Sequence, residues 1–326
     1  MHWRIKGTVQ KLLGYLPAGH ALHFHLQRRF GGLQNFSGEL ESKIEDWTIM
    51  TGHLRDAGVP LAGMRGFEIG TGWYPTFPLA CHLAGAQRLI TCDLNPHLRE
   101  DMLRRCVEEL ETFLPRIADA AGADATQVRE RYLRLRDRVM AGASLEAATD
   151  GVVHYHAPAD ATRTDLQEGD VDVVFSNSVL EHVPPEVITA MYREAMRILS
   201  PGGVMFHSVN CGDHYAYVDR DIHQLNYLRY SDRQWKRWNN AFLYQNRLRA
   251  HCFVDDARAL GFEIVLDTTT VLPERLQQLA GVPVHPQFAG IPADRLCVTT
   301  VDFIGRKPLR AAAPVRERED VLAGAG

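Results

Sequence analysis

The stretch "GFEIGTGWYPTFPLA", residues 66–80, places two glycines directly after a short apolar run. A strand, a glycine-rich turn and a helix in this order typically begin a nucleotide-binding α/β unit. A dinucleotide-binding turn carries a third glycine three residues after the second, but Pro75 stands at that position. Trp73 and Tyr74 also crowd the helix start that a pyrophosphate would approach. The turn therefore suits an adenosyl group better than NAD.

The remaining chain alternates short apolar segments with amphipathic ones. This alternation predicts an α/β fold with a doubly wound, mostly parallel sheet and helices on both faces. Residues 1–60 predict a helical N-terminal extension, and residues 98–117 predict one long amphipathic helix. The alternation stops at about residues 211–250, which form a polar and aromatic insertion, and then resumes. From residue 307 to residue 326 large apolar side chains are scarce, so we expect a disordered tail.

Composition excludes several classes of protein. The chain has 326 residues, of which 45% are hydrophobic, and a formal net charge of -4. This balance gives no general attraction to nucleic acid or to an anionic membrane. The six cysteines lack C-x-x-C spacing, which disfavours a zinc cluster or a disulfide scaffold and favours reduced thiols in a cytoplasmic protein. We find no signal peptide and no apolar run of the roughly 18 residues that a membrane span needs.

An acidic residue follows the second predicted strand. Asp93 lies about twenty residues beyond the glycine turn, where a carboxylate can accept hydrogen bonds from both hydroxyls of a ribose. The segments "FEIGTG", "TCDLN", "ADAT", "VDVVFSNSVLEHVPPE" and "MRILSPGGVMFHSVN" follow one another in the chain. In this combination the sequence resembles the class I S-adenosylmethionine-dependent methyltransferases, in their small-molecule branch. The resemblance covers about residues 60–210 and 250–306.

The resemblance implies a fold, a domain division and a cofactor. The fold would be a seven-stranded Rossmann-like sheet whose C-terminal strand pair, within residues 263–305, is an antiparallel hairpin. The methyltransferase domain would span residues 61–306, and S-adenosylmethionine would be the cofactor. The resemblance also assigns cofactor-binding roles: the methionine and ribose end to Glu68, Gly70 and Gly72, the ribose hydroxyls to Asp93, the adenine to Asp160 and Ala161, and the sulfonium neighbourhood to Asn177 and Ser178.

The acceptor side is expected in the insertion and in the loop after the fourth strand. Methyl transfer is an in-line displacement in which a hydroxyl or amine acceptor needs a base, and histidine titrates near neutrality. His214 is our first candidate for the general base with Asp213 as its orienter, and His223 is the second. The predicted substrate contacts are Tyr74, His182, Tyr217, Asn226 and Tyr230. The alternative for each is structural: Glu181 and His182 could cap the next helix, and the insertion could be a surface lid.

The predicted function is transfer of a methyl group to a hydroxyl or amine of a small metabolite. The alternatives are a non-catalytic S-adenosylmethionine-binding partner protein, an NAD-linked oxidoreductase, and an enzyme of the same fold that transfers no methyl group. We predict no metal site, because the acids and histidines of residues 207–223 match no metal-binding spacing. We expect no nucleic-acid partner and no stable membrane insertion, and the N-terminal helices could join two copies of the chain.

Overall fold

The computed structural model describes residues 2–16, 34–240 and 242–309, and the end of the predicted tail and part of the N-terminal extension lie outside these ranges. Its centre is a seven-stranded sheet in the order β3-β2-β1-β4-β5-β7-β6. The strands are β1 (Arg65–Ile69), β2 (Arg88–Cys92), β3 (Val153–His156), β4 (Val171–Asn177), β5 (Leu199–Asn210), β6 (Glu263–Asp267) and β7 (Thr300–Arg306).

Strand pairing confirms the predicted fold class. β1 to β5 pair in parallel, and β7 lies antiparallel between β5 and β6. β4 is buried along most of its length, as expected for a parallel strand that helices cover on both faces. The first strand of the chain thus lies in the middle of the sheet, with β2 and β4 on either side of it. This arrangement puts the ends of β1, β2 and β4 at the same edge.

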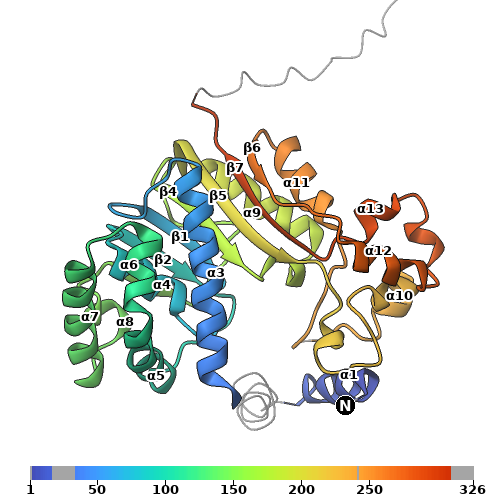
Figure 1. Cartoon of the computed structure of the whole chain (residues 1–326), viewed down its shortest axis with the longest axis horizontal. Helices are drawn as coiled ribbons and strands as arrows, with labels where there is room; N and C mark the ends of the chain where they lie inside the picture. Colours follow the sequence, from blue (N-terminus) through green and yellow to red (C-terminus); the bar gives the residue numbers. More distant parts are fainter. Residues whose placement is uncertain (1, 17–33, 241, 310–326) are drawn as a thin grey trace, which may run out of the picture.

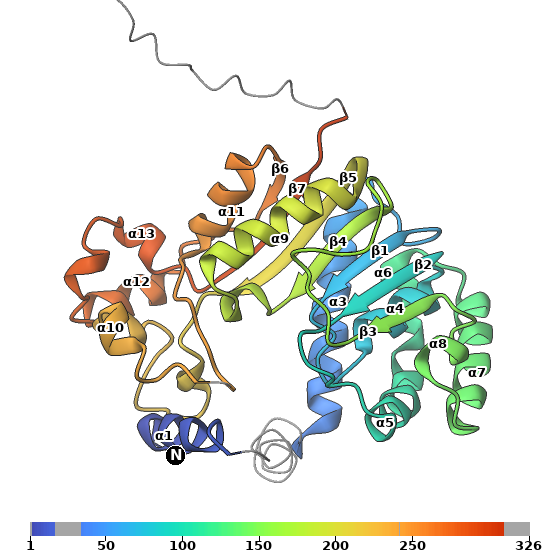
Figure 2. The same cartoon turned by 180° about the vertical axis from the view of Figure 1, so that it is seen from behind.

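Helices cover both faces of the sheet (Figures 1 and 2). One face carries α3 (Phe36–Asp56) with the α-helices that lie between β1 and β3 in the chain, and a continuous apolar core lies between them and the sheet. The other face carries α9 (Pro185–Ile198) and α11 (Ala250–Ala259) over a second core. The other main helices on the first face are α4 (Thr76–Ala84), α5 (Glu100–Leu110), α6 (Leu114–Ala121), α7 (Ala125–Met140) and the short α8 (Leu145–Ala148).

A third apolar cluster lies beyond the edge of the sheet. Here α1 (Trp3–Leu13) packs Trp3 against aromatic side chains of the insertion, including Tyr215, Trp235 and Trp238. The backbone N–H of Trp3 also donates to Asp219 Oδ2 at 2.9 Å. The segment between β6 and β7 completes the cluster with α12 (Pro273–Ala280) and α13 (Ala293–Leu296). The N-terminal extension and the insertion therefore share one core, with α1 and α3 on opposite sides of the lower part of the view in Figure 2.

Two details differ from the sequence analysis. The predicted helix over residues 98–117 is divided into α5 and α6 by a 3-10 turn at Glu111–Phe113. Pro115 lies in the first turn of α6 and has no backbone N–H to continue the α-helical bonding. Lys307, the first residue of the predicted tail, is still anchored, because its Nζ donates to the Leu199 carbonyl oxygen at 2.7 Å. Among the described residues, every helix is too short or too polar to cross a lipid bilayer.

Candidate functional site

The G-T-G turn lies between β1 and α4. Gly70 and Gly72 have φ values of +88° and +63°, a region that side chains with a Cβ rarely adopt. A Cβ at Gly70 would collide with Val179, whereas one at Gly72 would meet open space. The Gly70 N–H donates to the Cys92 carbonyl oxygen at 2.8 Å. The turn is therefore held closely between the end of β2 and the loop after β4.

Asp93 lies against this turn. Its Oδ2 accepts a hydrogen bond from the Gly72 N–H at 2.9 Å, and its Oδ1 accepts from the Asn95 N–H at 3.2 Å. The side chain is 13% exposed, with His97 Nε2 3.9 Å from Oδ1. The Asp93 carbonyl oxygen accepts from the Ala159 N–H at 2.9 Å. This bond brings the loop with Asp160 and Ala161 next to Asp93, as the predicted nucleoside site requires.

Asp160 is engaged locally. Its Oδ1 accepts hydrogen bonds from the N–H and the Oγ1 of Thr162, at 2.8 and 2.7 Å. These bonds lower the pKa of the exposed Asp160 carboxyl, so it is ionised at neutral pH. Ala161 is partly buried against the second core. The predicted adenine contacts are thus on a loop with a defined turn.

Glu68 lies beneath the turn, buried at 5% exposure. Burial raises the pKa of its carboxyl to about 7, although Thr91 Oγ1 donates a hydrogen bond to it. Lys43 of α3 also attracts this carboxylate, while Asp93 repels it. Glu68 is therefore only partly ionised at neutral pH, and a positive charge placed above the turn would favour its carboxylate form.

Asn177 and Ser178 end β4 and face the next strand and α3. Asn177 Nδ2 donates to Asp46 Oδ2 at 2.9 Å, and the Ser178 N–H donates to the Ser208 carbonyl oxygen at 2.9 Å. Burial raises the pKa of Asp46, partly offset by the Asn177 bond and by Lys43. Lys43 and Asp46 were not among the residues predicted for the site. They are three residues apart on one side of an amphipathic helix, next to the buried residues Ile44 and Trp47. This spacing was the signal that could have identified them.

Tyr74 packs into the core. Its ring centroid is 4.9 Å from that of Phe36, and its buried hydroxyl has no hydrogen-bond partner among the described residues. Burial raises the pKa of this hydroxyl. Trp73 Nε1 instead donates to His97 Nδ1 at 2.7 Å. These contacts point the Tyr74 ring toward α3 and argue against the predicted substrate contact.

Glu181, His182 and His214 come together at the same edge. Glu181 and His182 lie in a 3-10 turn, η3 (Leu180–His182), after β4, and His214 begins another, η4 (His214–Tyr217), after β5. His214 Nε2 is 3.9 Å from Glu181 Oε1, and the His182 and His214 ring centroids are 4.9 Å apart. Burial raises the pKa of Glu181 to about 8 and lowers that of His214 to about 3. Sequence reasoning left Glu181 and His182 open between capping the next helix and contacting the substrate, and did not group Glu181 with His214.

Asp213 and Asn226 form a buried pair behind His214. Asn226 Nδ2 donates to Asp213 Oδ2 at 2.8 Å, and the Tyr215 N–H donates to Oδ1 at 2.9 Å. Burial raises the pKa of Asp213 to about 6. The Asp213 carboxylate therefore caps η4, and within the described ranges its hydrogen bonds do not reach the His214 ring. The predicted orienting role and the predicted substrate contact of Asn226 thus lack support from these contacts.

The remaining predicted residues lie either at the Glu181–His182–His214 cluster or in the third apolar cluster, which the insertion shares with α1. The Tyr217 ring centroid is 5.4 Å from that of His214, and Asn210 Nδ2 donates to its hydroxyl. His223 Nδ1 accepts from the Leu225 N–H at 3.2 Å, and Tyr230 packs on Trp3 at 6.0 Å. Tyr217 therefore lies at the cluster, whereas His223 and Tyr230 support the folding of the insertion.

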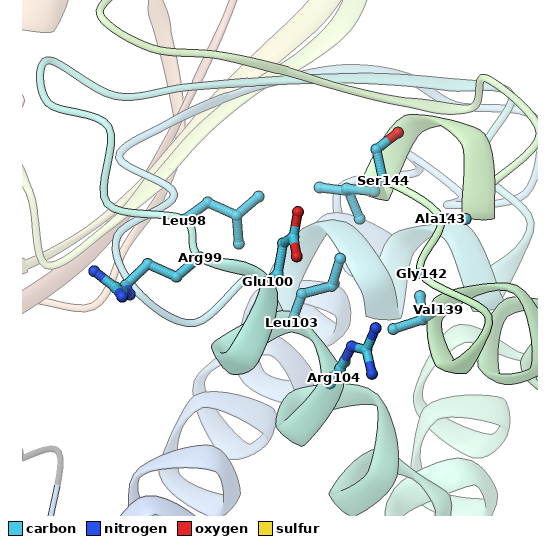
Figure 3. A pocket seen from close by; sticks show the side chains of 10 residues that line it. Leu98, Arg99, Glu100, Leu103, Arg104, Val139, Gly142, Ala143 and Ser144 are labelled. Carbon is cyan, nitrogen blue, oxygen red and sulfur yellow. The ribbon is translucent and has the colours of Figure 1, made fainter.

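A separate pocket of 160 Å³ opens between the start of α5, the end of α7 and α8 (Figure 3). Arg99, Glu100 and Arg104 are its charged lining residues, and Leu103 and Val139 are among its apolar ones. Its lining contains none of the predicted site residues. The predicted residues lie elsewhere, at the carboxyl ends of β1, β2, β4 and β5. We take this edge, with the G-T-G turn, Asp93 and the Glu181–His182–His214 cluster, as the candidate site.

Comparison with known proteins gives one family match. Residues 129–207 match the family described as "Methyltransferase domain". No curated protein matches the chain. The family match thus covers the part of the chain from α7 to β5, which includes η3.

Solved structures resemble the chain only distantly. An S-adenosylmethionine-dependent methyltransferase from Mesorhizobium loti is 16% identical, with 78% of this chain and 95% of that chain covered and a TM-score of 0.39. Geranyl diphosphate C-methyltransferase from Streptomyces coelicolor A3(2) is 10% identical, with 79% and 78% covered and a TM-score of 0.42. The [4+2]-cyclase SpnF is 14% identical, with 81% and 82% covered and a TM-score of 0.43.

Proposed function

We propose that the chain binds S-adenosylmethionine at the candidate site and transfers the methyl group to a hydroxyl or amine of a small metabolite. The match of residues 129–207 to a methyltransferase family model supports this proposal. The observation that carries this proposal is the bond from the Gly72 N–H to Asp93 Oδ2. It holds a carboxylate beside a glycine turn, at the carboxyl ends of parallel strands where such folds bind nucleosides. The chain is then an enzyme and S-adenosylmethionine is its cofactor.

The cofactor would lie across the ends of β1, β2 and β4. Asp93 would bind the ribose hydroxyls, and Asp160 and Ala161 would bind the adenine. Glu68 and the two glycines would lie at the methionine end, where Lys43 could pair with the cofactor carboxylate. Asn177 and Ser178 would flank the sulfonium. The contacts that support this pose are those that join the Ala159 backbone to Asp93 and Val179 to the glycine turn.

The acceptor would be activated at the Glu181–His182–His214 cluster. Val179, which packs on Gly70, belongs to the same loop as Glu181, so methyl donor and cluster are near one another. Holding two reactants in line supplies much of the rate in a displacement of this kind. His214 is the predicted proton acceptor. Burial lowers its pKa to about 3, which keeps the ring neutral at neutral pH but also makes it a weak base.

The enzyme would act on a small molecule, and a second copy of the chain would dock through the N-terminal helices. The outer face of α1 supports such an association, because Ile5, Val9 and Leu12 are 57%, 45% and 63% exposed. Sedimentation equilibrium measures the oligomeric state directly. A monomer at all concentrations would remove this part of the proposal.

Incubation with S-adenosylmethionine labelled in its methyl group tests the function. A panel of small hydroxyl and amine compounds should include an acceptor that gains label with wild type and loses it with Asp93→Ala. Cofactor binding without any labelled product across a wide panel would favour the non-catalytic binding protein. Binding of NAD in place of S-adenosylmethionine would favour the oxidoreductase.

A further inference from the structure

The cluster contains three side chains that metals commonly bind. One ligand atom from each of Glu181, His182 and His214 lies within 4.8 Å of the other two. β4 and β5 pair in parallel, so the segments that follow them meet at one edge. The spacing in the chain, two adjacent residues and one distant residue, gave no metal-binding pattern. Only the fold brings the three groups together.

Glu181 lacks the partners that a buried carboxylate needs. It is 3% exposed, and neither of its oxygens has a hydrogen-bond partner among the described residues. The backbone N–H groups of Glu181 and Asn210 face the carboxylate and, with Lys43, offset part of the effect of burial. A carboxylate in such surroundings is costly unless a proton or a cation neutralises it.

The two histidines present the lone pairs that coordination requires. His182 Nδ1 lies 2.7 Å from the Tyr244 carbonyl oxygen, which can only accept, so Nδ1 carries the proton and Nε2 keeps its lone pair. Histidine ligands of metals are typically oriented by such a bond. His214 Nε2 is buried and has no hydrogen-bond partner within the described ranges.

We propose that Glu181, His182 and His214 bind one divalent cation of the first transition row, next to the methyl donor. Two imidazoles and one carboxylate suit Zn²⁺, Fe²⁺ or Co²⁺, whereas Mg²⁺ and Ca²⁺ prefer oxygen ligands alone. Three protein ligands leave a coordination position for a small molecule. Lys6 faces His214 and Lys43 faces Glu181, and these charges oppose the cation in part.

The cation would activate the acceptor. A hydroxyl that binds at the open position has a lowered pKa and releases its proton to solvent. The oxygen then forms a bond to the methyl carbon while the carbon–sulfur bond breaks and sulfur keeps the electron pair. Coordination engages the lone pair of His214, so in this state the cation replaces the imidazole as the activating group. This role rests on the proposed function, whereas the binding of the cation does not.

Titration of the metal-stripped protein with Co²⁺, followed by visible absorption and by displacement with Zn²⁺, tests the site. Wild type should bind one equivalent. Glu181→Gln and His214→Ala should each lose at least roughly 10–100-fold in affinity, since that much is typical when only a hydrogen-bond partner of a ligand is removed. His154→Ala is the matched control. His154 also faces a glutamate, with Nδ1 3.1 Å from Glu146 Oε1, but it lies in the edge strand β3, which β2 and β1 separate from β4. The His154→Ala variant should bind Co²⁺ with the same affinity as wild type.

Two results would overturn the site. One is a wild-type protein that is folded by circular dichroism and binds S-adenosylmethionine but takes up neither Co²⁺ nor Zn²⁺. The other is equal metal affinity in wild type and both cluster variants. Metal binding without S-adenosylmethionine binding would instead leave the site in place and reject the proposed function. The two proposals can thus fail separately.

Discussion

His214 Nε2 lies 3.9 Å from Glu181 Oε1, with the two side chains only 14% and 3% exposed. The first residue belongs to the insertion after β5 and the second to the turn after β4. The glycine turn lies next to the same loop, so we propose this buried acid and buried imidazole as the reactive end of the site. The predictions below test this end and the cofactor end separately.

Removal of the His214 imidazole should impair turnover and spare cofactor binding. His214→Ala should reduce the rate of methyl transfer by roughly 10²–10⁴-fold, whether the ring acts as a base or as a ligand. Its affinity for S-adenosylmethionine should equal that of wild type, because the ring contacts His182 and Tyr217 and not the glycine turn. Single-turnover rates and calorimetric affinities measure the two effects. Unchanged turnover would remove His214 from acceptor activation.

The two glycines of the turn should differ in their tolerance of a methyl group. Gly72→Ala should lower the free energy of unfolding by about 1 kcal/mol, since only its positive φ is strained. Gly70→Ala should lower it by roughly 2–4 kcal/mol, because the added Cβ also collides with Val179. Urea denaturation of both variants measures the difference. Equal losses would mean that the turn does not pack on the β4 loop as described.

Cofactor affinity should depend on pH through Glu68. Burial raises the pKa of this carboxyl to about 7 in the cofactor-free protein. The positive charges of S-adenosylmethionine favour the ionised carboxylate, so binding releases a proton and affinity should rise from about pH 6 to about pH 8. The same raised pKa makes the cofactor-free protein lose stability as pH rises from about 4.5, the ordinary pKa of this carboxyl, to about 7.

Glu68→Gln provides the matched variant for this prediction, because its amide oxygen can still accept the bond from Thr91. Calorimetric titrations at several pH values should give a flat profile for Glu68→Gln and a rising one for wild type. Parallel profiles in the two proteins would assign the pH dependence to another group.

The sheet could be predicted because its signals are local. Apolar runs mark the parallel strands, and the G-T-G turn and Asp93 follow their strands directly. The break within residues 98–117 was predictable in principle from Pro115, but the apolar period continues across it. The segment between β6 and β7 was missed, because the strand pair looked like a simple hairpin and its intervening helices join a core that the N-terminus also builds.

The acceptor side was less predictable because it depends on contacts between distant segments. His214 and His182 were proposed from residue type and from their places after strand ends, yet nothing local indicated that Glu181 lies close to both. Lys43 reaches the site from α3, which precedes the first strand. Asp213 is an acid next to His214 in the chain, as an orienting residue would be, but its carboxylate accepts a hydrogen bond from Asn226. Such pairings join residues that are far apart in the chain, so no local sequence pattern predicts them.

Calorimetric titration of S-adenosylmethionine and S-adenosylhomocysteine tests the central claim, that the G-T-G turn and Asp93 form the cofactor site. Wild type should bind both, and Asp93→Ala should bind at least tenfold more weakly, since each charge-assisted bond to the ribose contributes roughly 1.5–3 kcal/mol. Asp119→Ala, on the exposed face of α6, should bind like wild type. Absence of binding to folded wild type, or equal binding by Asp93→Ala, would contradict the account.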